Sequence, residues 1–168
     1  MQSIYLLRVA IAGRTRRVGR RDIEEKDMHG LKKKIAIVAG AAPGNIGGAT
    51  AVRLAEEGML VVAADLNPAA AQAVADEITA FDGTAVAHGV DISDEDSYTE
   101  LIDFTVERFG GVHGLFNVAA DLSPQTIGRD SDVVSEPLEV WRHTTDVTLT
   151  GYMYGIRSLL VDGGANFT

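Results

Sequence analysis

Cysteine is absent from the 168-residue sequence, and aromatic residues make up only 6% of it. A chain without cysteine cannot form a disulfide, a cysteine-ligated zinc site or a thiol nucleophile, and it suits a reducing compartment. Hydrophobic runs long enough to span a bilayer are also missing. We therefore expect a cytoplasmic protein without membrane contacts, whose 46% hydrophobic residues build one ordinary globular core.

Positive charge is scarce outside the first fifth of the chain. Residues 1–34 carry a net charge of +6 and residues 35–168 a net charge of −15, which gives the formal −9 of the whole sequence. Lys34 is the last lysine, so beyond it only arginine carries a fixed positive charge. Because an acidic body repels phosphate, we expect no nucleic-acid partner.

The composition divides the chain into residues 1–27 and residues 28–168. We expect the first part to be a basic extension that is disordered or that precedes a mis-assigned start, because Met28 stands directly before a lysine-rich entry to the first expected strand. Two alternatives stay open. One is an organellar transit peptide, since the first 21 residues are rich in arginine and poor in acids. The other is a nucleic-acid-binding arm, which the lack of aromatic residues among the arginines disfavours.

Apolar segments alternate with segments of helical spacing from residue 33 onward. Buried strands are expected at 35–39, 60–64, 84–89 and 115–118. Helices are expected at 46–57, 68–81, 93–109 and 137–160, the second started by Asn67-Pro68 and the third capped by Ser93. This alternation predicts a doubly wound α/β fold with a parallel sheet, ending after four strands and a long helix.

A glycine-rich turn joins the first expected strand to the first expected helix. In the segment Gly40-Ala41-Ala42-Pro43-Gly44-Asn45-Ile46-Gly47, the first glycine makes a tight turn and the second lets the backbone approach a ligand. The third lets the helix pack closely on the strand. Such a turn aims the amides of a helix N-terminus at a diphosphate, as in Rossmann-type dinucleotide sites. The alternative is a merely tight strand-to-helix turn.

An acidic residue closes the second expected strand. Asp65 follows Gly47 by 18 residues, close to the spacing of about 20 at which an acid accepts hydrogen bonds from the adenosine ribose. Its charge would repel a 2′-phosphate, and residues 66–70 contain no arginine to bind one. We therefore expect NAD in preference to NADP. The alternative role for Asp65 is that of a solvated strand end or helix cap.

Four sequence elements in order resemble the short-chain dehydrogenase/reductase family. They are the glycine turn, Val90-Asp91-Ile92-Ser93, Phe116-Asn117-Val118-Ala119-Ala120 and Asp146-Val147-Thr148-Leu149-Thr150-Gly151. The resemblance implies a hydride-transferring oxidoreductase and a cofactor site built from Gly40, Gly44, Asn45, Ile46, Gly47, Asp65, Leu66, Asp91, Ile92, Asn117, Val118 and Ala119. The sequence departs from the family pattern at Thr148, where the family has asparagine. We expect Thr148 to be only a core-facing helix residue.

The family's catalytic pair, a tyrosine followed four positions later by a lysine, is missing. The tyrosines are followed at that distance by Val9, Ile102, Ile156 and Ser158. We therefore predict no catalytic residue in this chain, and the histidine spacing predicts no metal site. A chain that ends where the family's fifth strand begins is expected to be a truncated form. It would be marginally stable and would self-associate through apolar residues of the long helix: Met153, Ile156, Leu159 and Leu160.

These observations leave three hypotheses. The first is an NAD-dependent oxidoreductase acting, when completed, on a small alcohol or ketone. The second is an NAD-binding module without catalysis, and the third is an inactive gene fragment. A methyltransferase of similar fold would leave Asn117 and its neighbours unexplained. The substrate is not readable, although the loop from Asp121 to Glu136 would supply part of the pocket wall.

Overall fold

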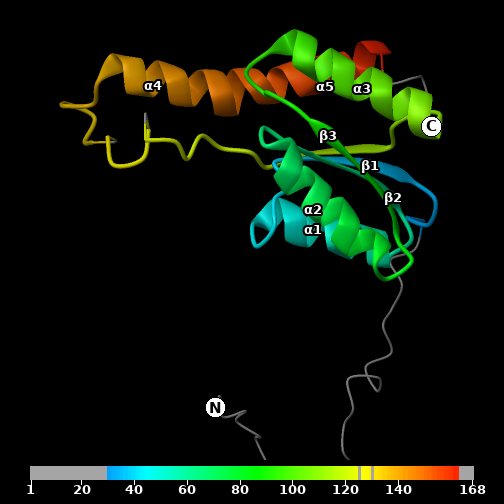
Figure 1. Ribbon diagram of the computed structural model, residues 1–168. Coiled ribbons are helices and arrows are strands. Elements are labelled where there is room, and N and C mark those ends of the chain that lie inside the picture. Colours follow the sequence, from blue (N-terminus) through cyan, green and yellow to red (C-terminus); the bar gives the residue numbers. More distant parts are fainter. Residues whose placement is uncertain (1–29, 125, 130, 163–168) are drawn as a thin grey trace, which may run out of the picture.

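The computed structural model describes residues 30–124, 126–129 and 131–162 (Figure 1). The predicted extension at residues 1–27 lies outside the described residues. The elements are β1 (Ile35–Ala39), α1 (Ile46–Glu56), β2 (Leu60–Asp65), α2 (Pro68–Thr79), β3 (Thr84–Gly89), α3 (Glu95–Phe109), β4 (Gly114–Asn117), α4 (Leu138–Thr145), the π-helix η1 (Asp146–Thr150) and α5 (Gly151–Asp162). Within the described ranges, no helix has the length and apolar composition that crossing a membrane requires.

The four strands form one parallel sheet in the order β3-β2-β1-β4. Its register places Ile37 of β1 opposite Val62 of β2 and Leu115 of β4. Parallel neighbours need crossover connections, which the intervening helices supply. The predicted doubly wound α/β fold is confirmed, and β4 lies at the edge of the sheet.

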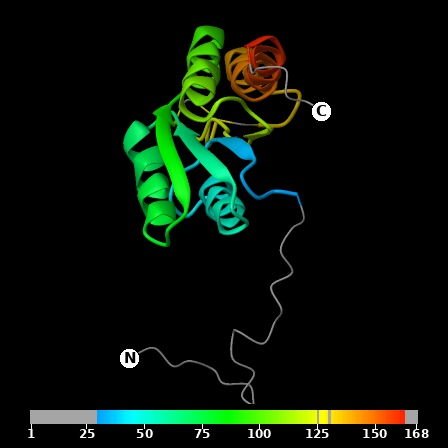
Figure 2. The same ribbon diagram turned by 90° about the vertical axis from the view of Figure 1, so that its right-hand side faces the viewer.

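Each face of the sheet has its own core, because successive side chains of a strand point to opposite faces. Ile37 and Val62 point to one face and pack with residues of α3 and α5. Val38 and Val61 point to the other face and pack with residues of α1 and α2. Figure 2 shows these two helical layers on either side of the sheet. Burial on both faces explains why β1 is apolar throughout its length.

The helix boundaries follow local capping chemistry, with one correction. Asn67 caps α2 by accepting a hydrogen bond from the Ala69 amide at 3.1 Å, as expected for an Asn-Pro start. The expected cap of α3, Ser93, is wrong. Asp94 caps that helix instead, since its carboxylate accepts from the Asp96 amide at 3.1 Å. The Ser93 hydroxyl donates to Asp91.

The predicted long helix is interrupted by a π-helical segment. Residues 138–162 run as α4, η1 and α5, so the wider turn lies at 146–150. Two side chains near this turn bond to the backbone one turn before them. The Thr148 hydroxyl donates to the Thr144 carbonyl at 2.6 Å, and the Thr145 hydroxyl donates to the Trp141 carbonyl at 2.8 Å. Isolated π segments of this kind often occur at functional sites.

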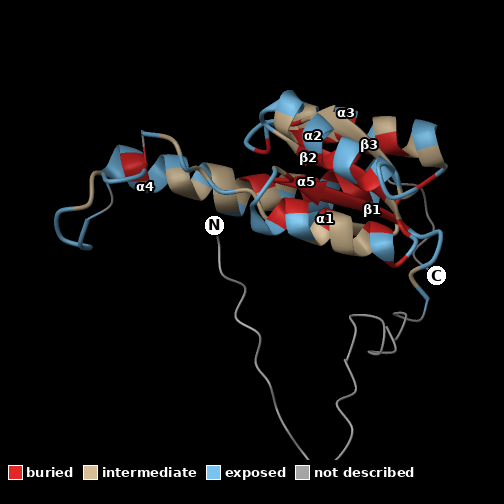
Figure 3. Ribbon diagram, turned by 60° about the horizontal axis from the view of Figure 1, so that its bottom comes forward, coloured by how far each residue is buried: buried red, intermediate tan, exposed pale blue. Residues whose placement is uncertain are grey.

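Three of the four apolar residues of α5 that were expected at the surface are exposed. Met153, Ile156 and Leu160 are 44%, 54% and 69% exposed. The prediction is wrong for Leu159, which is only 8% exposed and packs into the core between the sheet and α3. Figure 3 shows this contrast between the buried sheet and the exposed positions along α4 and α5.

A substitution at Gly155 tests the contact between α5 and α3. A Cβ at this position would lie 2.7 Å from the ring of Tyr98, which is fully buried and cannot move aside. We expect Gly155→Ala to lower the free energy of unfolding by about 1–3 kcal/mol, despite the better helix propensity of alanine. Urea unfolding measures the change. Gly114→Ala is the control, since a Cβ there meets nothing within 4 Å. Equal stability of the two variants would contradict the contact.

We propose that the exposed face of α5 drives self-association. Because Ile156 is apolar and more than half exposed, we expect Ile156→Glu to shift the chain toward monomer in sedimentation velocity measurements at matched concentration. The control is Val134→Glu, which adds the same charge at an exposed apolar residue of the loop before α4. A wild-type chain that sediments as a monomer would contradict the prediction.

Candidate functional site

A cavity of about 810 Å³ lies at the carboxyl ends of the strands. Its walls come from the turn after β1, the ends of β2 and β3, the segment after β4, and α4 with η1. Such an edge is where ligands bind in open parallel sheets, because the loops there diverge around the switch in strand order. The α4 helix and the loop before it extend beyond the sheet at this end (Figure 1).

Eleven of the twelve residues that the sequence predicts for the site line this one cavity. They are Gly40, Gly44, Asn45, Ile46, Gly47, Asp65, Leu66, Asp91, Ile92, Val118 and Ala119. These residues are far apart in the sequence and are brought together by the parallel strand order. Asn117 does not line the cavity, and its predicted contact with a cofactor stays a prediction.

Two glycines of the turn after β1 permit backbone contacts that no other residue would allow. Gly40 has a φ of 101°, and a Cβ there would lie 2.6 Å from the amide nitrogen of Ala119. A Cβ on Gly47 would lie 2.1 Å from the Gly40 carbonyl oxygen. The predicted tight turn and close helix packing are therefore present. Gly44 has a φ of 78° with open space beside it, which leaves the loop backbone accessible from the cavity.

Asn45 holds this turn in shape. Its side-chain oxygen caps α1 by accepting from the Gly48 amide at 2.7 Å and also accepts from the Ala42 amide at 3.2 Å. Its side-chain nitrogen donates to the Gly40 carbonyl at 2.9 Å. The side chain therefore ties the helix start to the strand end and fixes the orientation of the first-turn amides of α1. Those amides form the positive end of the helix dipole.

Two acids line the part of the cavity next to β2 and β3. Asp65 accepts a hydrogen bond from the Asn67 amide at 2.9 Å. Asp91 accepts from both the amide and the hydroxyl of Ser93, at 2.9 and 2.7 Å. These contacts are local turn-forming ones, and they orient both carboxylates at the cavity wall.

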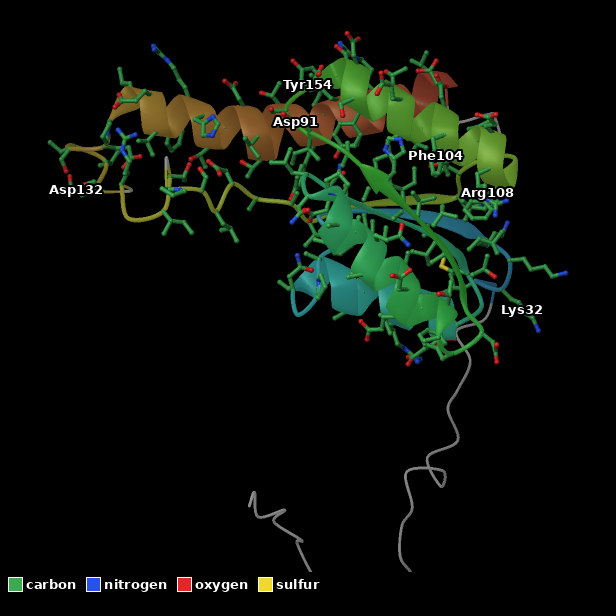
Figure 4. The ribbon with its side chains drawn as sticks, viewed as in Figure 1. Lys32, Asp91, Phe104, Arg108, Asp132 and Tyr154 are labelled. Atoms are coloured by element: carbon green, nitrogen blue, oxygen red, sulfur yellow. The ribbon has the colours of Figure 1, made fainter. Side chains whose placement is uncertain are left out.

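The charge around the cavity is negative. Asp65, Asp91 and Asp121 line it, and no lysine or arginine of the described ranges does. Figure 4 shows that Lys32 and Arg108 lie at the opposite end of the domain from Asp91. A ligand bound here would meet a field unfavourable to added negative charge, except at the helix N-terminus.

Two tyrosines and Asn117 connect the helical layer to the cavity wall. The Tyr98 hydroxyl donates to the Asn117 side-chain oxygen at 2.6 Å, and the Tyr152 hydroxyl donates to the Ala119 carbonyl at 2.8 Å. The Asn117 side-chain nitrogen donates to the Tyr152 carbonyl at 3.5 Å. Burial raises the pKa of both tyrosine hydroxyls, so both remain neutral donors. Asn117 thus positions the wall instead of lining it.

A histidine and an aspartate that the sequence analysis missed also line the cavity. His143 Nε2 lies 2.8 Å from the Asp121 carboxylate. Asp121 also accepts hydrogen bonds from the Ser123 amide, at 2.8 Å, and from the Thr126 hydroxyl. The two partners are separated by the whole loop before α4, so spacing along the chain gave no signal of their contact. No group of three or more potential metal ligands occurs in the described part of the chain.

Thr148 behaves as a structural helix residue. It is half-buried, and its hydroxyl donates a hydrogen bond to the Thr144 carbonyl one turn earlier. It does not line the cavity, although its neighbour Val147 does. The expected core-facing role of Thr148 stays a prediction.

The glycine turn and Asp65 form a cradle that fits a dinucleotide. A Cβ at Gly40 or Gly47 would clash with the neighbouring backbone that shapes this turn, and the first residues of α1 line the cavity. Asp65, the last residue of β2, lines the same cavity, and its expected contact with a ribose hydroxyl stays a prediction.

Comparisons with known proteins agree on one family. A family model described as short chain dehydrogenase matches residues 34–162. The cyclohexanol dehydrogenase of Acinetobacter sp. (strain SE19) is 35% identical over 138 residues, which cover 80% of this chain and 53% of that protein. The trans-4-hydroxycyclohexanecarboxylate dehydrogenase of Sinomonas cyclohexanicum is 33% identical over 134 residues, which cover 76% of this chain and 49% of that protein.

Solved structures give the same result. A short chain dehydrogenase from Mycobacterium smegmatis has a TM-score of 0.70 and 31% identity, over 78% of this chain and 52% of that one. A hydroxysteroid dehydrogenase from Escherichia coli has a TM-score of 0.66 and 30% identity, over 77% of this chain and 52% of that one. The chain therefore spans about half the length of the relatives that it matches.

The Asp121 cluster predicts a specific dependence of stability on pH. Burial would raise the pKa of this carboxyl, but hydrogen bonds from Thr126 and Ser123 and the nearby His143 outweigh it and lower the pKa to about 2. Because the folded pKa lies below the unfolded one, the stabilisation is present above the unfolded pKa of about 4 and is lost as the pH falls toward about 2.

We therefore expect the free energy of unfolding to fall more steeply between about pH 5 and about pH 2.5 in the wild type than in Asp121→Asn. Urea titrations at a series of pH values measure the difference. Thr126→Val removes one donor to Asp121 and should give an intermediate slope. Parallel curves for all three proteins would show that the cluster does not lower this pKa.

Proposed function

The chain belongs to the short-chain dehydrogenase family, and from this membership we propose that it binds NAD(H) for hydride transfer between the cofactor and an alcohol or carbonyl substrate. One observation carries the proposal: the glycine turn, Asp65, Asp91 and the segment after β4 line a single cavity. Family members bind NAD or NADP, and for this chain we propose NAD.

The residues of the cavity have distinct roles in binding. The turn from Gly40 to Gly47 would let the diphosphate approach the backbone, with the α1 amides directed at it by Asn45. Asp91 and Ile92 would contact the adenine, and Val118 and Ala119 would contact the ribose beyond the diphosphate. When bound, NAD supplies the carbon atom that accepts or donates the hydride.

Asp65 supports NAD over NADP. Its carboxylate lines the cavity after β2, where it would accept hydrogen bonds from the adenosine ribose hydroxyls. A 2′-phosphate at the same place would meet this negative charge, and no lysine or arginine among the described cavity residues would compensate it.

We assign acid-base catalysis to no residue of this chain. No tyrosine among the 168 residues is followed four positions later by a lysine. That absence favours a second candidate function, an NAD-binding module without catalysis. The two candidates share the same cofactor site and differ only in turnover.

The substrate class that we propose is an alicyclic secondary alcohol or the corresponding ketone. The name of one relative, a cyclohexanol dehydrogenase, supports it. The apolar residues Leu122 and Val147 at the cavity wall suit a ring of carbon atoms.

Titration with NAD⁺ tests the proposal. We expect saturable binding to the wild type and about 10- to 100-fold weaker binding to Asp65→Ala, because a charge-assisted hydrogen bond to the ribose is lost. Isothermal titration calorimetry measures both affinities, and NADP⁺ should bind the wild type more weakly than NAD⁺ does. In Asp65→Ala, the affinities for NAD⁺ and NADP⁺ should differ less than they do in the wild type.

The matched control is Asp103→Ala, which removes the same charge from an exposed position on α3 outside the cavity. It should bind NAD⁺ as the wild type does. Absence of saturable binding to the wild type, or an equal loss in the control, would contradict the proposed cofactor site. Turnover of cyclohexanol by the purified chain would exclude the non-catalytic candidate.

A further inference from the structure

One end of the cavity is built from residues that the predicted dinucleotide site does not use. These residues are Asp121, Leu122, Ser123, His143 and Val147. They come from two parts of the chain, the loop after β4 and the consecutive helices α4 and η1. This end follows β4, which lies two strands away from β2 and the Asp65 proposed to bind the ribose.

The orientation of the His143 ring at this end of the cavity is fixed by its contact with Asp121. Its side chain is half exposed, and Nε2 lies 2.8 Å from the Asp121 carboxylate. A carboxylate only accepts, so Nε2 must carry the proton that it donates. In the neutral ring Nδ1 is then an acceptor, and no hydrogen bond of Nδ1 is seen among the described residues. A ligand that donates a hydrogen bond matches this ring nitrogen.

Asp121 is itself held in place. Its side chain is only 11% exposed, and it accepts from the Ser123 amide and the Thr126 hydroxyl as well as from His143. The three donors keep the carboxylate ionised and in one orientation. The imidazole is therefore aimed by a rigid partner, an arrangement in which the second nitrogen is prepared for a ligand at low entropic cost.

The charges at this end of the cavity select against anionic ligands. With a neutral imidazole the Asp121–His143 pair carries one negative charge, and with an imidazolium it carries none. Asp65 and Asp91 add two further acids to the same cavity. A ligand carboxylate would meet this field, whereas the apolar Leu122 and Val147 would contact an uncharged carbon skeleton.

We propose that His143, oriented by Asp121, binds the hydroxyl group of an uncharged alicyclic alcohol through Nδ1. This inference deepens the proposed function and rests on it, since it names the group that recognises the substrate and restricts the substrate to uncharged alcohols. The hydroxyl donates to Nδ1, and the ring of the alcohol packs against the apolar wall. Anionic hydroxy acids bind weakly at this site.

The experiment is a titration of the ¹⁵N-labelled full chain with cyclohexanol, followed by the ¹⁵N resonances of the histidine rings at about pH 8, where an ordinary imidazole is neutral. We expect a saturable shift of His143 Nδ1. His88 and His113 are internal controls, because neither lines the cavity. His88 stacks on Phe104, and His113 Nδ1 accepts from the Ile35 amide at 3.1 Å.

Variants test the role of the pair. We expect His143→Gln to bind cyclohexanol at least about fivefold more weakly, because an imidazole acceptor is lost while NAD⁺ affinity is kept. Asp121→Asn should weaken cyclohexanol binding by a similar factor, since the ring loses its oriented partner. Arg142→Gln is the matched control, an exposed neighbour on α4 outside the cavity. Trans-4-hydroxycyclohexanecarboxylate should bind at least about tenfold more weakly than cyclohexanol.

The titration is run with and without NAD⁺, so that two failures can be told apart. Loss of NAD⁺ binding in the wild type would contradict the proposed function. A His143 resonance that does not shift in either condition would overturn this inference, as would equal cyclohexanol affinity of the wild type and His143→Gln. A variant that changes only the melting temperature would show that the pair merely fastens the loop to α4.

Discussion

The close backbone contact at the end of β1 is the constraint on which the site depends. Gly47 of α1 lies against the Gly40 carbonyl, and Gly40 lies against the backbone after β4 at Ala119. Three backbone segments can approach so closely only because two of the contacting residues lack a Cβ. The same contact brings the helix N-terminus, the strand end and the segment after β4 to one cavity. Asn45 then locks the turn with its side chain.

A second set of contacts supports this cavity from the helical layer. Gly155 of α5 makes room for the ring of Tyr98, whose hydroxyl bonds to Asn117. Tyr152 reaches the Ala119 carbonyl from the same helix. The cavity wall after β4 is therefore held from the sheet side by Gly40 and from the helix side by tyrosine hydroxyls. The position of the long helix thus bears on the geometry of the site.

Much of the fold could be predicted because its signals are local. Continuous apolar runs mark strands buried on both faces, and Asn67-Pro68 marks a helix start that the structure confirms. The errors have local causes too. Ser and Asp are both favourable N-cap residues, so the sequence does not distinguish Ser93 from its neighbour Asp94, which caps α3. Helical periodicity places Leu159 on the surface, because it does not tell which neighbouring element covers a given face of the helix.

The parallel α/β order, the glycine turn and the acid at the end of β2 follow from residue type and spacing within short segments. The support that Asn117 gives the wall, the π turn in the long helix and the contact of His143 with Asp121 become visible only in the folded chain. Those outcomes depend on contacts between segments distant in the chain. Such contacts are fixed by how the sheet, its helices and the loop after β4 pack together, and packing leaves no periodic trace in the sequence.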